Sequence, residues 1–229
     1  MLTLKTFPEP VIPPKQTAPS PQQIVEDFHQ LYYADKQKST WQDTYWMGQR
    51  VFKCPLDLWI YQEILWDVKP DVIIECGTCL GGSALFLANM CDVISKGRVI
   101  TIDIDPPDGK PQHPRLSYLQ GSSTSDAVVR HIRNGIKTGE KVLVILDSDH
   151  HRDHVFNELR IYSGIVTVGS YIIVEDSNVN GHPVSPKHGP GPMEAIEDFL
   201  RENRDFKIDL SREKFMMTFN PLGHLKRIR

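Results

Sequence analysis

Carboxylate side chains follow two short hydrophobic segments of the chain. Asp147 and Asp149 come after the run VLVIL, and Glu175 and Asp176 come after the run YIIV. Both runs predict buried strands of a parallel sheet, so the four acids are expected at one edge of that sheet. Carboxylates gathered in this way raise one another's pKa unless a cation lies among them. Because oxygen ligands favour a hard ion, these acids predict a site for Mg²⁺, with Ca²⁺ or Mn²⁺ as alternatives and a solvated acidic rim as the non-functional explanation.

Two histidines, His150 and His151, stand directly after the first acidic pair. A metal ion lowers the pKa of a hydroxyl bound to it, and a neighbouring histidine can take the proton that is released. We therefore expect His150 or His151 to be the catalytic base, and the sequence leaves the choice between them open. His182 and His188 lie in the Gly/Pro/His-rich loop 181–192, which has the length of an active-site lid, and they are weaker candidates for contact with a substrate.

The segment VIIECGTCLGGS (72–83) predicts a buried strand, a glycine-rich turn and the start of a helix. The glycines allow the backbone to turn sharply and a ligand to approach it closely. Glu75 is expected at the carboxyl end of the strand, where open α/β sheets bind ligands. The spacing differs from the dinucleotide fingerprint Gly-x-Gly-x-x-Gly, which argues against NAD.

Other strand ends add features of a nucleoside site. Asp103 ends the next predicted strand, where a carboxylate can accept hydrogen bonds from both hydroxyls of a ribose, and Asp105 is the competing candidate. Ser122 and Ser123 follow a third strand and fit either the edge of an adenine pocket or the cap of the helix near residues 126–136. An acid at the end of the first strand resembles the first motif of S-adenosylmethionine-dependent methyltransferases. The expected cofactor-binding residues are Glu75, Gly77, Thr78, Gly81, Gly82, Ser83, Asp103, Ser122, Ser123 and Asp147.

Composition bounds the class of protein. The 229 residues suffice for one α/β domain with a terminal extension, and a formal net charge of −3 gives no general attraction to nucleic acid. The sequence contains neither an apolar run of 18 residues nor a signal peptide, so we expect no membrane partner and a cytoplasmic location. Cys76 and Cys79 form a C-x-x-C pair, but no second pair exists for zinc and the pair precedes the helix, so both are expected to be reduced and half-buried.

The chain divides into residues 1–40 and residues 41–229. The first part is a proline-rich arm followed by an amphipathic helix over 22–34, with Ile24, Phe28, Leu31 and Tyr32 at helical spacing. Such an arm favours self-association, so a homo-oligomer is expected. The aromatic residues of 41–52 are expected to pack the next helix onto the sheet rather than to line a substrate pocket.

Further elements are expected in the second part. A helix over 55–66 is predicted to bury Leu56, Trp59, Ile60 and Ile64. Strands over 206–210 and 214–219 are expected to close the sheet, and the basic tail 224–229 is expected to be a solvated end. Helices are predicted over 83–92, 152–163 and 193–201.

The second part resembles the cephalosporin hydroxylase family, and more distantly catechol and macrolide-sugar O-methyltransferases. The resemblance rests on KCPLDLWIYQEIL, IIECGTCLGGSALFLA, GRVITIDID, LDSDHH, GSYIIVEDSNVNG and GPGPMEAI in this order. It implies a Rossmann-like class I methyltransferase fold: a mostly parallel seven-stranded sheet with helices on both faces and an N-terminal helical extension. It also implies binding of S-adenosylmethionine and Mg²⁺, and several relatives methylate sugar hydroxyls.

Site residues follow from the same resemblance. Glu75, Gly77 and the following glycines would hold the methionine part of the cofactor, Asp103 the ribose, and the two serines the adenine. Glu175 and Asp176 would ligate the metal, and either Asp147 or Asp149 would be the third ligand.

The sequence thus predicts a Mg²⁺-dependent S-adenosylmethionine O-methyltransferase for a hydroxyl of a small polyhydroxylated substrate. A hydroxylase or oxidoreductase, as the family name suggests, is one alternative. A non-catalytic subunit that binds cofactor and assists a partner enzyme is the other.

Overall fold

A seven-stranded sheet forms the centre of the molecule. The computed structural model describes residues 18–34, 40–106 and 108–229, and orders the strands β5-β4-β3-β6-β7-β9-β8. The strands β3 to β7 run parallel, whereas β9 is antiparallel to both of its neighbours. The strands are β3 (Val72–Cys76), β4 (Arg98–Asp103), β5 (Leu116–Gln120), β6 (Val142–Leu146), β7 (Tyr171–Val174), β8 (Phe206–Ile208) and β9 (His224–Arg227).

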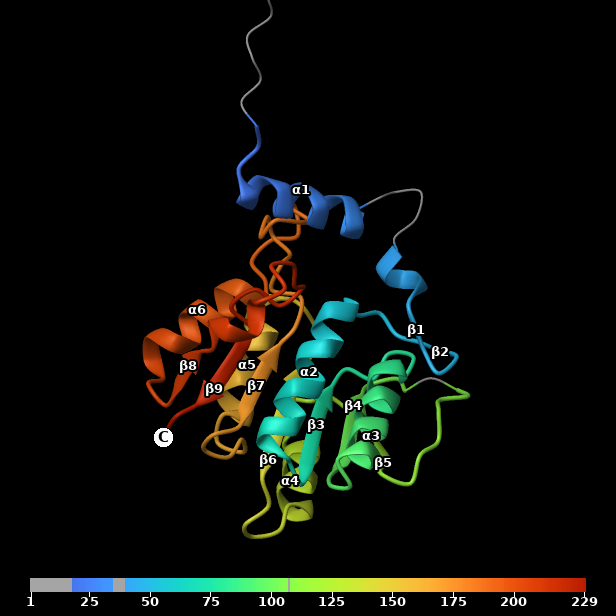
Figure 1. Ribbon diagram of the computed structural model, residues 1–229. Helices are drawn as coiled ribbons and strands as arrows, with labels where there is room; N and C mark the ends of the chain where they lie inside the picture. The colour runs from blue at the N-terminus through green and yellow to red at the C-terminus, as the bar shows by residue number, and fades with distance from the viewer. Residues whose placement is uncertain (1–17, 35–39, 107) are drawn as a thin grey trace, which may run out of the picture.

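Helices cover both faces of this sheet (Figure 1). One face packs against α2 (Pro55–Val68) and α3 (Gly82–Val93), and the other packs against α4 (Asp126–Gly135), α5 (Arg152–Tyr162) and α6 (Pro192–Glu202). Strands covered on both sides must be apolar throughout, and β3, β6 and β7 are buried at every position. The predicted fold class is therefore confirmed. Among the described residues, no helix has the length and hydrophobicity needed to cross a membrane.

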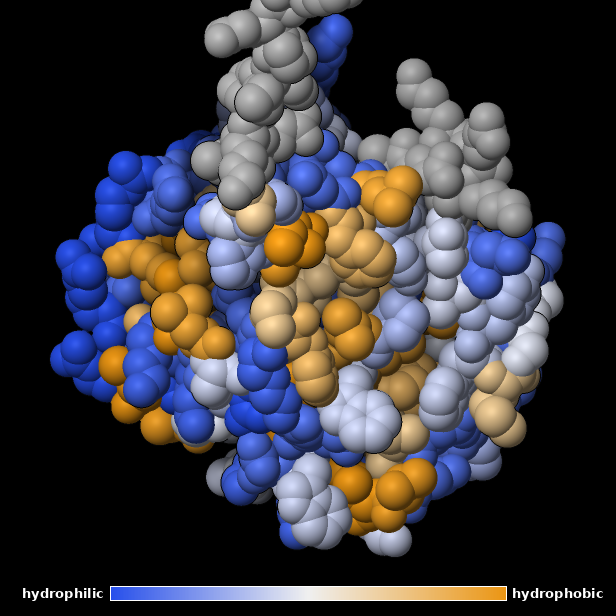
Figure 2. Space-filling model, turned by 45° about the horizontal axis from the view of Figure 1, so that its top comes forward, coloured by the Kyte–Doolittle hydropathy of each residue, from blue (hydrophilic) through white to orange (hydrophobic). Residues whose placement is uncertain are grey.

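The N-terminal helix α1 (Pro21–Ala34) lies across the top of the molecule in Figure 1, above the sheet. Its hydrophobic residues Ile24, Phe28 and Leu31 are more than half exposed, whereas His29 is buried. The reason is that α1 packs on loops instead of on the sheet: the His29 ring stacks on Phe219 with centroids 5.6 Å apart. Figure 2 shows hydrophobic side chains gathered in the centre of this upper face. The proline-rich arm predicted for residues 1–21 lies mostly outside the described residues.

Between α1 and α2 the chain forms short elements, namely η1 (Thr40–Asp43), β1 (Tyr45–Trp46) and β2 (Gln49–Arg50). The aromatic residues here do not pack the next helix onto the sheet as expected: Trp46 meets Phe86 of α3 edge to face at 4.9 Å, and Trp41 stacks on Tyr33 of α1 at 5.3 Å. The stripe predicted for α2 is wrong at Trp59, which is 60% exposed. Asp57 is buried instead and accepts hydrogen bonds from the Thr218 hydroxyl and the Phe219 amide.

Three further expectations about local structure are wrong. Residues 214–219 do not form a strand, because their backbone and side chains bond to Asp57 rather than to a neighbouring strand. The basic tail is not a solvated end: its residues form β9, inserted between β7 and β8 with Leu225 fully buried. The helix α4 is capped by Ser125, whose hydroxyl accepts a hydrogen bond from the Val128 amide, and not by Ser122 or Ser123.

His224 makes the free energy of unfolding depend on pH. Its ring is buried, and both ring nitrogens have no hydrogen-bond partner among the described residues. Burial lowers the pKa of His224 to about 4, so between about pH 6.5 and pH 4 the unfolded chain binds a proton that the folded chain does not. The folded state therefore loses stability as the pH falls through this range.

We predict that His224→Phe reduces this loss by about 2 kcal/mol between pH 7.5 and pH 4.5, as measured by urea unfolding at each pH. His131→Phe, at an exposed position of α4, serves as the matched control and should follow the parent protein. Identical pH dependence in the parent and in His224→Phe would contradict the assignment.

Candidate active site

The sheet brings three acids together on the same face. Side chains along a strand alternate between faces, so an acid two residues after an inward-pointing isoleucine lies on the isoleucine's side. Three acids each come two residues after an isoleucine that packs beneath α2 and α3, namely Glu75, Asp147 and Glu175. The isoleucines are Ile73, Ile145 and Ile173. Ile145 and Ile173 are partners in the sheet register, whereas Ile73 of the neighbouring strand β3 lies opposite Leu143. The predicted meeting of acids after β6 and β7 is therefore observed for Asp147 and Glu175, and Glu75 of β3 lies on the same face.

A buried lysine lies between two of these acids. The Lys53 ammonium contacts Asp147 Oδ2 and lies 2.6 Å from Glu175 Oε2, and only 4% of its side chain is exposed. Burial alone lowers the pKa of Lys53, but Asp147 and Glu175 outweigh that effect and raise it, so the lysine stays charged. Sequence reasoning missed Lys53, because it precedes a helix and carries no strand-end signal. The one signal in the sequence that could have indicated a buried lysine was the need for a cation among the acids.

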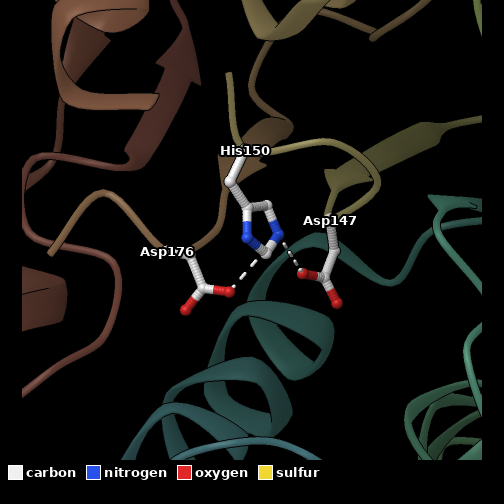
Figure 3. Close-up of side chains that lie close together, drawn as sticks. All are labelled: Asp147, His150 and Asp176. Atoms are coloured by element: carbon white, nitrogen blue, oxygen red, sulfur yellow. Dashed lines mark hydrogen bonds and ion pairs between the residues drawn. The ribbon is translucent and has the colours of Figure 1, made fainter. Parts of the chain in front are cut away.

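His150 bridges Asp147 and a fourth acid, Asp176 (Figure 3). Its Nε2 lies 3.3 Å from Asp147 Oδ1 and 3.3 Å from Asp176 Oδ2. Burial lowers the pKa of His150, but the charges of Asp176 and Asp147 outweigh it and raise the pKa to about 9. One ligand atom from each of these three residues lies within 4.8 Å of the others, which is a spacing suited to a metal ion.

Asp176 is held in an uncommon backbone conformation. Its φ of 53° lies in the left-handed region, and its amide donates a hydrogen bond of 3.1 Å to Asn220 Oδ1. The Asn220 side chain in turn donates to the Tyr61 hydroxyl of α2 at 3.0 Å. Asn220 therefore orients Asp176 from a segment 44 residues away, which sequence reasoning also missed.

Asp149 and His151 form a separate pair at the rim. Asp149 Oδ1 lies 2.5 Å from His151 Nδ1 and accepts the His151 amide at 2.9 Å. Both side chains are at least half exposed, and the His151 ring lies 5.4 Å from the ring of His188 in the loop 181–192. Of the alternative ligands and bases, Asp147 and His150 lie beside Asp176, whereas Asp149 and His151 do not.

A cavity of about 390 Å³ opens at the ends of β3, β4 and β6. Five of the residues predicted to bind cofactor line it, namely Gly77, Asp103, Ser122, Ser123 and Asp147. A smaller hollow beside Lys53 is lined by Thr78, Gly82 and Ser83, three others from the prediction. The remaining two, Glu75 and Gly81, line neither space.

The glycine-rich turn is shaped by its contacts to neighbouring strands. A Cβ on Gly77, where φ is +98°, would lie 1.8 Å from the Asp147 carbonyl oxygen, so only glycine fits there. Asp103 Oδ2 accepts hydrogen bonds from the amides of Thr78 and Cys79 at 3.0 and 3.1 Å and so holds the turn. Glu75 is fully buried: Oε2 accepts from the Thr101 hydroxyl, and Oε1 has no hydrogen-bond partner among the described residues. Burial raises the pKa of Glu75 to about 7.

A buried carboxylate that the sequence did not reveal supports the wall of the cavity. Glu158 Oε1 accepts hydrogen bonds from Ser123 and Ser148 at 2.5 and 2.7 Å, and His154 Nε2 lies 3.4 Å away. The expectation of two half-buried cysteines is wrong in detail, because Cys76 is fully buried and Cys79 is exposed at the cavity.

Hydrogen bonds to α6 hold the predicted lid loop 181–192. Glu194 of α6 accepts hydrogen bonds from the Asn180 side chain and the Gly191 amide, and it lies 3.0 Å from His182 Nε2. The loop therefore stays beside the carboxyl edge of the sheet, and its upper part reaches α1 (Figure 1).

A mostly parallel seven-stranded sheet with an antiparallel β9, a glycine turn after the first central strand and acids at the carboxyl edge define the methyltransferase fold of class I. The sequence model described as Rhamnosyl O-methyltransferase/CmcI matches residues 38–228. The chain belongs to this family, which confirms the resemblance found in the sequence.

Curated relatives cover almost the same length. A rhamnosyl O-methyltransferase of Mycobacterium leprae (strain TN) is 41% identical over 211 residues, which cover 89% of this chain and 90% of the relative. One of Mycobacterium bovis (strain BCG / Pasteur 1173P2) is 39% identical over 213 residues, covering 89% and 85%. A solved structure of CmcI with Mg and SAM has a TM-score of 0.65 at 21% identity over 82% of this chain and 78% of that chain, which supports the shared fold.

The ion pairs of Lys53 generate a prediction about stability. Removing one partner of a buried ion pair leaves an uncompensated charge and costs roughly 3–5 kcal/mol. We therefore expect Lys53→Met to lower the free energy of unfolding by about 3 kcal/mol in metal-free buffer, as measured by urea unfolding.

Lys214→Met is the matched control, because Lys214 pairs with Glu63 at 2.7 Å on the surface, where a pair contributes about 1 kcal/mol or less. The double variant Lys53→Met with Glu175→Gln should recover part of the loss. Equal losses in Lys53→Met and Lys214→Met would contradict a buried charge cluster.

Proposed function

We propose that this chain transfers the methyl group of S-adenosylmethionine to a hydroxyl of a sugar in a Mg²⁺-dependent reaction. The observation that carries the proposal is the position of Asp147, which belongs to the acidic cluster with His150 and also lines the cavity predicted to hold the cofactor. A metal-bound hydroxyl and a methyl donor would meet at this residue. The names of the near-full-length curated relatives support a sugar as the acceptor.

The donor set fits Mg²⁺. We assign Asp147 and Asp176, the two carboxylates of the closely spaced group, together with Glu175, the neighbouring buried acid that pairs with Lys53, as the residues that would hold it. Carboxylate oxygens are the ligands a hard ion prefers, and His150 is left as the base. Glu175 supports this by its buried Oε1, which has no hydrogen-bond partner in the described part of the chain. With Lys53 present, a divalent ion would balance the charge of the three carboxylates. Asp149, the competing ligand, is engaged with His151.

The predicted cofactor-binding residues would each contact a different part of the cofactor. Asp103 would accept the ribose hydroxyls with Oδ1, which also accepts the Asp105 amide at 3.0 Å, since its Oδ2 already accepts the two amides of the glycine turn. Ser122 and Ser123 would lie at the adenine, and Glu75 with the glycines at the methionine part. When bound, S-adenosylmethionine supplies an electrophilic methyl group on a positively charged sulfur, and Mg²⁺ supplies a Lewis acid that lowers the pKa of a bound hydroxyl.

His150 is the residue we assign as the base. Its Nε2 would accept the proton of the substrate hydroxyl in the loaded enzyme, where a metal ion would offset the charges of Asp147 and Asp176 that raise the pKa of His150 and so would leave the ring neutral. Lys53 and Asn220 orient the acids, and the loop 181–192 with α1 limits access of water from above. His151, the alternative base, is 73% exposed and lies outside this arrangement.

The hydroxylase alternative needs a different set of ligands. Non-haem iron oxygenases use two histidines and one carboxylate, whereas neither the three carboxylates assigned here nor the group of Asp147, His150 and Asp176 contains two histidines. The glycine spacing likewise argues against NAD. The acceptor's identity, the homo-oligomeric state and the cytoplasmic location stay predictions.

The test is to incubate the purified chain with S-adenosylmethionine, Mg²⁺ and methyl α-L-rhamnopyranoside and to follow the product by mass spectrometry. We expect O-methylation that stops when the metal is chelated. Asp147→Asn and His150→Gln should lower kcat/KM by about 10²-fold or more, which is the usual contribution of a positioned base.

Asp149→Asn and His151→Gln are the matched controls, and each should lower kcat/KM by less than about tenfold. Transfer that resists both chelation and Asp147→Asn would contradict the metal mechanism. A partner enzyme that this chain still stimulates after Asp147→Asn and His150→Gln would favour a non-catalytic subunit.

A further inference from the structure

A second cavity, of about 380 Å³, lies beneath α1. We call it the α1 cavity. It is formed by the first half of α1, by His182 and Pro183 of the lid loop, and by the segment 213–221. Within the described part of the chain it shares no lining residue with the cofactor cavity.

Two short chains of contacts link the α1 cavity to the acidic cluster. His29 lines it and lies 2.9 Å from the side chain of Asn178, two residues after Asp176. Thr218 also lines it, and its hydroxyl accepts a hydrogen bond from the Asn220 amide, whose side chain holds Asp176. Since one residue spans less than 4 Å of chain, the cavity begins on the order of 10 Å from the proposed metal ligands.

The chemistry of the walls suits a saccharide. Carbohydrate rings combine apolar C–H faces with hydroxyl donors, and the cavity combines apolar surfaces with side chains that accept hydrogen bonds. The apolar surfaces come from Pro21, Val25, Pro183, Met216 and Pro221, and the acceptors from Glu26, His182 and Glu213. His29 Nε2 already accepts from the Asn178 side chain, so its ring offers a donor. Its volume falls in the usual range of small-molecule sites, about 300–1,000 Å³.

The charge of the walls excludes an anionic ligand. None of the described residues that line the cavity is Lys or Arg, and two of them, Glu26 and Glu213, carry carboxylates. His29 adds no positive charge near neutral pH, because burial lowers its pKa to about 4. Phosphate recognition normally uses arginine, lysine or a row of backbone amides, so a nucleotide-activated sugar does not fit this cavity.

We propose that the α1 cavity binds a second saccharide unit of an uncharged glycoside, while the first unit receives the methyl group at the acidic cluster. This inference rests on the proposed function and narrows its substrate class. It also places the reaction in a sequence: glycosyl transfer must come first, because the acceptor is already a glycoside when methylated.

The test compares methyl α-L-rhamnopyranoside with the methyl glycoside of a rhamnose disaccharide as acceptors. We expect the parent protein to use the disaccharide with a kcat/KM about tenfold higher, mainly through a lower KM. Val25→Trp fills the cavity and should bring the ratio of the two kcat/KM values close to one.

Ile24→Trp is the matched control. Ile24 is the neighbouring residue on the outer side of α1 and is 54% exposed, so the same new side chain should leave the ratio as in the parent. Glu26→Ala removes one acceptor without filling the cavity and should lower the ratio at least threefold. It keeps the proposal testable if Val25→Trp fails to fold. Saturation-transfer NMR with S-adenosylhomocysteine and the disaccharide gives the same comparison without turnover.

Equal use of both acceptors by the parent, or equal ratios in Val25→Trp and Ile24→Trp, would overturn the proposal. Better use of a nucleotide-activated rhamnose would overturn the uncharged acceptor, and dependence on Val25 only with octyl α-L-rhamnopyranoside would assign the cavity to an apolar aglycone instead. If no sugar is methylated but disaccharide binding by NMR still depends on Val25 and Glu26, the proposed function fails and the saccharide site stands.

Discussion

The gathering of carboxylates at one edge of the sheet is the constraint on which the rest of the site depends. Parallel strands with alternating side chains bring Glu75, Asp147 and Glu175 onto the face covered by α2, and like charges in a buried place are unstable without cations. Lys53 and His150 supply positive charge from two different loops. The proposed metal would add to this balance, so the cluster that would bind the ion also fixes the position of the proposed base.

Cofactor and acceptor would approach this cluster from opposite sides. The glycine turn and Asp103 form the wall of the cofactor cavity, while α1 and the lid loop form the α1 cavity. Asp176 connects the two sides, because Asn220 holds its amide and the segments that contain Asn178 and Thr218 line or support the α1 cavity. In the proposed function, the arrangement thus separates methyl donor and glycoside while presenting both to Asp147.

The features that could be predicted from the sequence are those with a local pattern of hydrophobic residues, acids and glycines. Short β-branched runs followed by acids or glycines indicated every central strand, and with them Asp103, Asp147 and the acids after β7. Lys53, Asn220 and Glu158 were missed because each acts on a residue far away in the chain, and a distant partner leaves no periodic signal. The C-terminal strand was misassigned for a related reason: residues 214–219 look like a strand, but Asp57 of α2 binds their backbone and side chains.

The most direct test of this account is an anomalous difference map from crystals grown with Mn²⁺ and S-adenosylhomocysteine, recorded near the manganese edge. The account predicts one peak bounded by Asp147, Glu175 and Asp176, with Lys53 still beside Glu175. A peak at Asp149 and His151, or none at the carboxyl edge of the sheet, would contradict it.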